Sequence, residues 1–259
     1  MYQNKIFVLG SPRSGTSVVG RGVTRIVGGH IYSESHLIPL FSNLLDTVDE
    51  YYQKDNFQPS MMASLYSKNY IVGKLELILK DAMRGVVVDK TPGIGMIKSI
   101  PLIKELWPKS KIIFCKRRGL ENIKSRQKKW PHVKFENHCR DWAASMELWE
   151  KAKVNLDFLE VDQFDVVKEP SNIASQIGTY LELTQADIKE LALELSEPSK
   201  EGVPSQQAMS LSELDWSDEQ LEIFDKVCGQ VMKRYGYTSG PEYSLNNKGL
   251  ISQQFKEVL

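Results

Sequence analysis

KIFVLGSPRSGTSVVGRGVTR, residues 5–25, is the stretch of this chain that decides its fold. Residues 6–9 are apolar without interruption, which is typical of a strand buried in a parallel sheet. A glycine-bounded turn follows over residues 10–15, and from Thr16 the apolar positions recur at the spacing of one helix face. Such a turn gathers backbone N–H groups at the positive end of the helix dipole, which predicts a binding site for a phosphate-like anion.

The turn nearly matches the nucleotide-binding pattern Gly-x-x-x-x-Gly-Lys-Ser/Thr. Gly10 and Gly15 have the required spacing and Ser17 stands at the hydroxyl position, but Thr16 replaces the lysine that contacts the β- and γ-phosphates. The cation inside the turn is Arg13. We therefore expect the turn to hold its anion differently and without a metal ion. A P-loop kinase or nucleoside triphosphatase stays open as the alternative.

Two further apolar runs end in basic residues. Residues 85–89 are typical of a buried strand and are followed by Lys90, and residues 111–115 are followed by Lys116-Arg117-Arg118. Ligands in doubly wound sheets bind beyond the carboxyl ends of the strands. Lys90 is therefore expected to face the same crevice as Arg13.

Composition and charge distribution restrict the class of protein. The 259 residues are 41% apolar and 25% charged, which fits a soluble globular protein with a substantial core. Formal net charge is zero, but residues 111–140 hold 10 Lys/Arg against 2 Asp/Glu, which favours a polyanionic ligand there. Cys115, Cys139 and Cys228 have no paired spacing, so the chain indicates a reducing compartment and not a disulfide framework.

The organisation of the chain predicts one domain over residues 1–259, with residues 238–259 as a C-terminal arm or tail. The expected fold is three-layer α/β, with a central, mostly parallel sheet flanked by helices. No leader and no apolar run of membrane-spanning length is found, so we expect a cytoplasmic protein with neither membrane nor nucleic-acid partners. The oligomeric state is left open.

The remaining elements follow from periodicity. Helices are expected near residues 70–83, 97–106, 120–129, 137–154 and 217–234, and a further strand at 158–161. Leu37-Ile38-Pro39 is expected to close a short extended piece, and residues 41–70 to cover the site with helices and loops. In the helix at 70–83, the spacing of Ile71, Leu75, Ile78 and Leu79 predicts a core face.

Pro12-Arg13-Ser14-Gly15-Thr16 after a first strand resembles the 5′-phosphosulfate loop of sulfotransferases that use 3′-phosphoadenosine-5′-phosphosulfate (PAPS). These enzymes bind the 3′-phosphate with an arginine at a strand end and a serine eight residues later, and Arg117 and Ser125 reproduce that spacing. The family commonly has Asp after the arginine. This chain has Arg118 there, which leaves open which arginine makes the contact. The resemblance covers about residues 5–237.

The resemblance implies a role for each matching residue. Arg13, Ser14, Gly15, Thr16 and Ser17 would bind the 5′-phosphosulfate, and Lys90 would neighbour the transferring sulfuryl group. In the branch that resembles tyrosylprotein sulfotransferase, a glutamate shortly before an Ile-Pro pair is the general base. Glu34 has that place, and a buried carboxylate suits the task.

Other implied roles are weaker. His36 is the rival base, because histidine has that role in other sulfotransferases. Lys200 matches a late basic loop that closes over the cosubstrate. The expected products are desulfated PAPS (PAP) and the sulfate ester of a sugar, a small molecule or a tyrosine. A non-catalytic nucleotide-binding module of the same fold is a further alternative.

Overall fold

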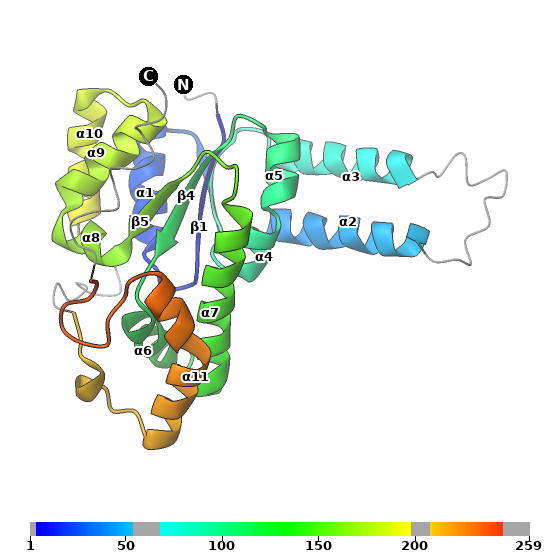
Figure 1. The fold of residues 1–259 in the computed structure, drawn as a ribbon. Helices are drawn as coiled ribbons and strands as arrows, with labels where there is room; N and C mark the ends of the chain where they lie inside the picture. The colour runs from blue at the N-terminus through cyan, green and yellow to red at the C-terminus, as the bar shows by residue number, and fades with distance from the viewer. Residues whose placement is uncertain (1–3, 54–67, 198–207, 246–259) are drawn as a thin grey trace.

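A computed structural model of the chain describes residues 4–53, 68–197 and 208–245. Five strands form one sheet in the order β2-β3-β1-β4-β5, with all neighbours parallel. The strands are β1 (Ile6–Gly10), β2 (His30–Ser33), β3 (Val86–Lys90), β4 (Lys111–Lys116) and β5 (Leu159–Asp162). The expected α/β fold with a parallel central sheet is thereby confirmed (Figure 1).

Helices flank the sheet on both faces (Figure 1). In chain order they are α1 (Thr16–Val27), α2 (Leu37–Gln53), α3 (Lys68–Ala82), α4 (Ile94–Lys98), α5 (Ile100–Leu106), α6 (Gly119–Lys129), α7 (Phe135–Ala152), α8 (Gln163–Lys168), α9 (Pro170–Leu181), α10 (Gln185–Ser196) and α11 (Asp218–Arg234), with a 3-10 turn at Leu211–Glu213. In the described part of the chain, no helix is both long enough and apolar enough to cross a bilayer.

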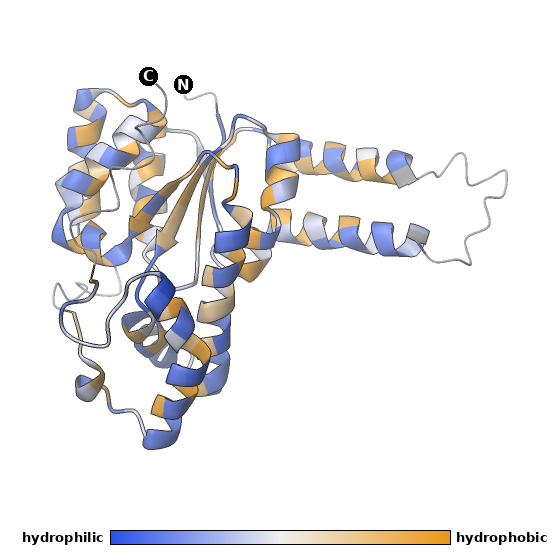
Figure 2. Ribbon diagram, in the orientation of Figure 1, coloured by the Kyte–Doolittle hydropathy of each residue, from blue (hydrophilic) through white to orange (hydrophobic). Residues whose placement is uncertain are grey.

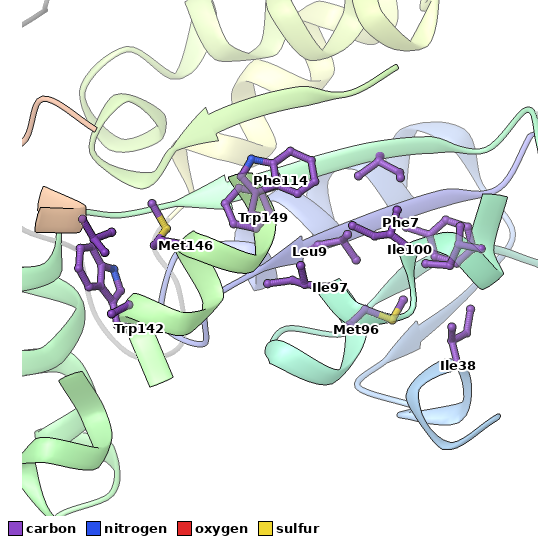
Figure 3. Close-up of a cluster of buried hydrophobic side chains, with 14 of the residues drawn as sticks. Phe7, Leu9, Ile38, Met96, Ile97, Ile100, Phe114, Trp142, Met146 and Trp149 are labelled. Carbon is purple, nitrogen blue, oxygen red and sulfur yellow. The ribbon is translucent and has the colours of Figure 1, made fainter. Parts of the chain in front are cut away.

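The central strand β1 supplies both cores, because successive side chains of a strand point to opposite faces. Ile6 and Val8 join a buried cluster with α1, α9 and α10. Phe7 and Leu9 join the larger cluster on the other face, which Figure 3 shows. There Phe114 and Trp149 stack with ring centroids 4.2 Å apart. In Figure 2 the middle of the sheet is accordingly hydrophobic, while hydrophobic and hydrophilic residues alternate along the helices.

The region after β2 differs most from expectation. Leu37-Ile38-Pro39 does not close a loop but begins α2. Proline is tolerated in the first turn of a helix, where its missing N–H has no partner to lose. Ile78 was expected in the core and is 57% exposed, because α2 and α3 project side by side away from the sheet (Figure 1). The single helix expected at 97–106 is instead the pair α4 and α5.

Candidate active site

The turn between β1 and α1 is shaped to receive an anion. Gly10 closes β1 with a φ of 152°, and a Cβ there would collide with the carbonyl oxygen of Cys115 in β4. Gly15, with a φ of 85°, precedes α1, and no side chain within the described residues caps the start of this helix. The first backbone amides of α1 therefore lie at the positive end of the helix dipole without a side-chain acceptor.

Asn122 of α6 holds this turn in place. Its Nδ2 atom donates to the carbonyl oxygen of Pro12 and to the hydroxyl of Ser14, each at 3.0 Å. Asn122 and Ser14 are both buried. A side-chain amide that joins two points of one turn fixes its shape, because a buried donor is costly to leave unsatisfied.

The same face of α6 carries two more contacts to the turn. Arg13 Nε donates to Ser125 Oγ at 3.0 Å, and Arg126 Nη1 donates to Ser11 Oγ at 3.4 Å. Arg126 is buried and pairs with Asp141 of α7 at 2.7 Å. Sequence reasoning named Ser125 but missed Asn122 and Arg126. The signal was their i, i+3, i+4 spacing with Ser125, which puts all three on one helix face.

Arg117 lies directly after β4 and faces the turn. Its Nη1 donates to the carbonyl oxygen of Arg13 at 3.1 Å, and its own carbonyl accepts from Trp142 Nε1 at 3.0 Å. Its Nε atom is buried and has no hydrogen-bond partner among the described residues. Burial lowers the pKa of Arg117, although nearby Tyr243, Glu121 and Asp162 act in the opposite direction. A buried guanidinium with an unused donor is suited to a ligand anion.

Arg118, the competing residue, has a different environment. Its guanidinium is fully buried, pairs with Glu121 and donates to the carbonyl oxygens of Met209, Thr238 and Gly240. These contacts join the start of α6 to the segment before the 3-10 turn and to residues 238–245. Arg118 therefore holds these segments together, whereas Arg117 is the arginine that contacts the turn. Residues 246–259 of the expected arm lie outside the described residues.

Glu34 and Lys90 form an ion pair beside the turn. Lys90 Nζ lies 2.6 Å from Glu34 Oε1, with the lysine side chain 4% exposed and the glutamate side chain 50% exposed. The backbone N–H of Glu34 donates to the carbonyl oxygen of Lys90 at 2.8 Å. The lysine stem crosses α1 at Gly20, where a Cβ would come within 2.8 Å of Lys90 Cγ. The small residue in α1 thus gives the lysine its route to the glutamate.

His36 is exposed and lies close to a buried carboxylate, Asp89. Asp89 accepts from Thr91 Oγ1 at 2.7 Å and from Ser35 Oγ at 3.4 Å. Burial raises the pKa of Asp89, while these hydrogen bonds and the charges of His36 and Lys90 act to lower it. Sequence reasoning assigned no role to Asp89, which anchors the segment that carries both candidate bases.

The other predicted site residues are distributed as follows. Ser14 is buried in the turn, Thr16 is buried at the start of α1, and Ser17 is exposed on the first turn of α1. Lys200 lies outside the described residues. Within the ranges that the structure describes, no three His, Cys, Asp or Glu side chains gather as a metal site would require.

Comparison with known proteins places the chain in a family. A family profile described as "Sulfotransferase family" matches residues 5–187. This range includes the β1–α1 turn, Glu34, Lys90, Arg117 and Ser125. No match was found among curated proteins.

Solved structures share the fold at low identity. The sulfotransferase domain of the Synechococcus PCC 7002 olefin synthase has a TM-score of 0.51 and 15% identity, and the match covers 86% of this chain and 94% of that domain. Sulfotransferase STF9 from Mycobacterium avium has a TM-score of 0.54 and 10% identity, with 91% and 77% covered. Mouse sulfotransferase SULT7A1, solved with PAP, has a TM-score of 0.52 and 13% identity, with 89% and 85% covered. The chain belongs to the sulfotransferase family.

Proposed function

We propose that this protein transfers the sulfuryl group of PAPS to a hydroxyl acceptor. The observation that carries the proposal is the meeting of the β1–α1 turn with Arg117 and Ser125, both of which contact Arg13. Two anion-binding elements that are far apart in the chain thus lie together at one edge of the sheet. PAPS has phosphates at both its 3′ and 5′ positions and would engage both elements at once.

The residues present fit such a donor. The start of α1 offers backbone amides to the 5′-phosphosulfate. Arg117 offers its unused buried Nε to the 3′-phosphate, a dianion that a planar guanidinium binds through two oxygens. Ser125 adds a hydroxyl. The solved mouse relative with PAP supports this donor class by analogy of fold alone.

In the proposed reaction, the acceptor oxygen attacks sulfur in line with the departing 5′-phosphate. One S–O bond forms, the S–O bond to the phosphate breaks, and Glu34 takes the proton of the acceptor hydroxyl. His36 is the alternative base. Arg13 and Lys90 stabilise the negative charge on the bridging and sulfuryl oxygens.

The Glu34–Lys90 ion pair adds a condition to this reaction. Lys90 Nζ donates a hydrogen bond to the carboxylate of Glu34, the proposed base. The Glu34 oxygen that accepts from Lys90 is engaged by that ammonium group. Lys90 must therefore exchange Glu34 for a sulfuryl oxygen when the donor binds, and this exchange frees Glu34 for the acceptor.

Calorimetric titration followed by a transfer assay tests the proposal. We expect PAP to bind without Mg²⁺ and ATP–Mg to bind weakly or not at all. Radiolabelled PAPS should then label one or more acceptors among sugars, phenols, tyrosine peptides and extract of the source cells. Preference for ATP–Mg would favour a P-loop kinase instead. Binding of PAP with no transfer to any acceptor would favour a non-catalytic module.

We also propose the cytoplasm as the compartment. Cys115, Cys139 and Cys228 are all buried free thiols, and none of them forms a disulfide. Free thiols persist in reducing compartments. Fractionation of the source cells with an antibody to the protein checks this, and recovery from a secreted fraction would contradict it.

A further inference from the structure

Asp89 is a buried carboxylate that the proposed reaction does not use. In the sheet it lies beside Phe7 and therefore points to the face opposite α1, whereas the next residue, Lys90, points to the α1 face. Asp89 is 1% exposed. A carboxylate buried to this extent is costly unless hydrogen bonds or charges satisfy it, so its partners define its role.

One carboxylate oxygen of Asp89 contacts the segment at residues 34–36. Ser35 Oγ donates to Asp89 Oδ2 at 3.4 Å, and the backbone N–H of Leu37 donates to the same hydroxyl at 3.3 Å. Both distances are at the long end for hydrogen bonds. Through Ser35, Asp89 is thus connected to the first residue of α2, where the helical hairpin of α2 and α3 leaves the sheet (Figure 1).

The other carboxylate oxygen contacts the loop after β3. Thr91 Oγ1 donates to Asp89 Oδ1 at 2.7 Å, and both residues are 1% exposed. Two residues later, the backbone N–H of Gly93 donates to the carbonyl oxygen of Gly10 at 2.8 Å. Gly10 is the residue at which β1 passes into the turn of residues 10–15. Asp89 is therefore connected to this turn as well.

We propose that Asp89 is a positioning residue that fixes the segment at residues 34–36 relative to the turn at residues 10–15. This inference rests on the proposed function, in which the segment carries the base, Glu34, and the turn holds the donor. In-line attack depends on that geometry, since a misplacement of about 1 Å can lower the rate about 100-fold. Each carboxylate oxygen accepts from one side of the site, so a single buried side chain sets the distance between the two sides.

The backbone of the segment has a second attachment, which makes the role of Asp89 testable. The N–H of Glu34 donates to the carbonyl oxygen of Lys90, whatever side chain stands at position 89. Asparagine keeps the shape of Asp89 but replaces one acceptor oxygen by an NH₂ group, which cannot accept a hydrogen bond. Asp89→Asn should therefore loosen both contacts and leave the segment attached to β3.

Hydrogen–deuterium exchange of the full chain without ligand tests the connection. In Asp89→Asn, amides at residues 34–37 and in the loop at residues 91–93 should both exchange at least about 5-fold faster, the order expected for loss of one hydrogen bond. Ser35→Ala should affect the first region only, and Thr91→Val the second only, because each variant removes one of the two contacts.

Steady-state kinetics and calorimetry test the effect on the reaction. Asp89→Asn should lower kcat about 10–100-fold and leave PAP affinity within about 3-fold. Combined with Glu34→Gln, it should lower kcat no further than Glu34→Gln does alone, because a base that is absent cannot also be misplaced. Glu160→Gln is the matched control, since the Glu160 side chain is only 18% exposed but lies in β5. This control should keep both kcat and the exchange of the two regions.

Faster exchange in neither region of Asp89→Asn, or in one region only, would overturn the proposal. So would losses of kcat that multiply in the double variant. A wild-type chain that transfers no sulfuryl group would contradict the proposed function instead, and the exchange comparison would still decide whether Asp89 connects the two regions. If circular dichroism shows Asp89→Asn to be unfolded, Ser35→Ala with Thr91→Val removes the same two contacts and should give the same exchange pattern.

Discussion

The turn at residues 10–15 and the segment at residues 34–36 lie at the same edge of the sheet but are held in different ways. Asn122 and Arg126 of α6 donate hydrogen bonds into the turn, and Arg13 of the turn donates to Ser125. The segment at 34–36 is tied through Lys90 and Asp89 instead, and both regions hold non-glycine residues at positive φ: Arg13 in the turn, and Glu34 and His36 in the segment. Positive φ is uncommon for residues other than glycine.

In the proposed function the turn at residues 10–15 is the donor side of the site and the segment at residues 34–36 is the acceptor side, and their difference would let one fold serve a common donor and variable acceptors. The turn is fixed by buried hydrogen bonds from a helix packed in the core. The acceptor side is half exposed and joins a hairpin that projects from the sheet. A site with these two sides can keep its donor while the acceptor side changes, because binding residues on loops vary more freely than the scaffold beneath them.

The largest effect is expected from Glu34→Gln on the acceptor side. Loss of the general base should lower kcat by roughly 10²–10⁴ and leave PAP affinity unchanged, which steady-state kinetics and calorimetry measure together. Glu50→Gln, an exposed carboxylate on α2, is the control. Full activity in Glu34→Gln would remove Glu34 from the reaction, and the same assay on His36→Asn would then test the rival base.

On the donor side, Arg117→Ala should weaken PAP binding about 100-fold, the order expected for loss of a bidentate charge-assisted contact. The backbone bond from Trp142 to residue 117 does not need the side chain, so the fold should be kept. Lys124→Ala, which removes an exposed cation from the same helix, should change affinity little. Equal losses in both variants would mean that general positive charge, and not Arg117, binds the nucleotide.

Asn122→Ala tests whether α6 really holds the turn. Removal of the amide takes hydrogen bonds from Pro12 and Ser14, so we expect PAP affinity to fall about 10-fold and unfolding to become easier by about 1–2 kcal/mol. Asn137→Ala on α7 is the control, because Asn137 is exposed. An affinity unchanged by Asn122→Ala would show that the turn keeps its shape without α6.

The smallest effect on the site is expected from Glu160→Gln, in β5 away from both sides. Burial acts to raise the pKa of Glu160, but Lys116, Trp149 and Lys153 outweigh it and lower the pKa to about 2. Because this pKa is lowered, the ionised carboxylate of Glu160 stabilises the fold at pH values above its ordinary pKa of 4.5. This contribution is lost as the pH falls toward 2.

The free energies of unfolding in urea of the wild type and of Glu160→Gln should therefore differ at neutral pH. They should converge as the pH falls from 4.5 toward 2. Turnover at neutral pH should be the same in both. A difference in stability that stays constant down to the acid end would show that the carboxylate charge contributes nothing.

The strand, the turn and the helix start on the proposed donor side could be predicted from the sequence because their signals are local. Residues 6–16 contain strand, turn and helix start in one stretch, and the spacing of Arg117 and Ser125 spans one strand end and one helix. The choice between Arg117 and Arg118 could not be made, since two adjacent basic residues look alike in sequence. Only the packing of Tyr243 and the carbonyl oxygens of residues 238 and 240 around Arg118 separates them.

The proposed acceptor side was harder to predict, because contacts between residues far apart in the chain hold it in place. Helical periodicity found the span of α3 but expected Ile78 in a core, when the helix has a partner on one side only. The ion pair of Glu34 with Lys90 joins residues that are far apart in the chain, and no short pattern encodes it. Asn122 and Arg126, which contact the turn, were overlooked although their spacing with Ser125 puts them on the same face of α6.

The burial of Arg118 has a consequence for biosynthesis. Its guanidinium depends on the carbonyl oxygens of Thr238 and Gly240, and its backbone N–H donates to Tyr243 Oη at 3.0 Å. While residue 243 of a nascent chain is still inside the ribosome, Arg118 lacks these partners. Arg118 is the neighbour of Arg117, which contacts the turn. The surroundings of Arg117 and Arg118 would then form only after residue 243 has left the ribosome, and ribosome-bound fragments that stop before this segment would lack them.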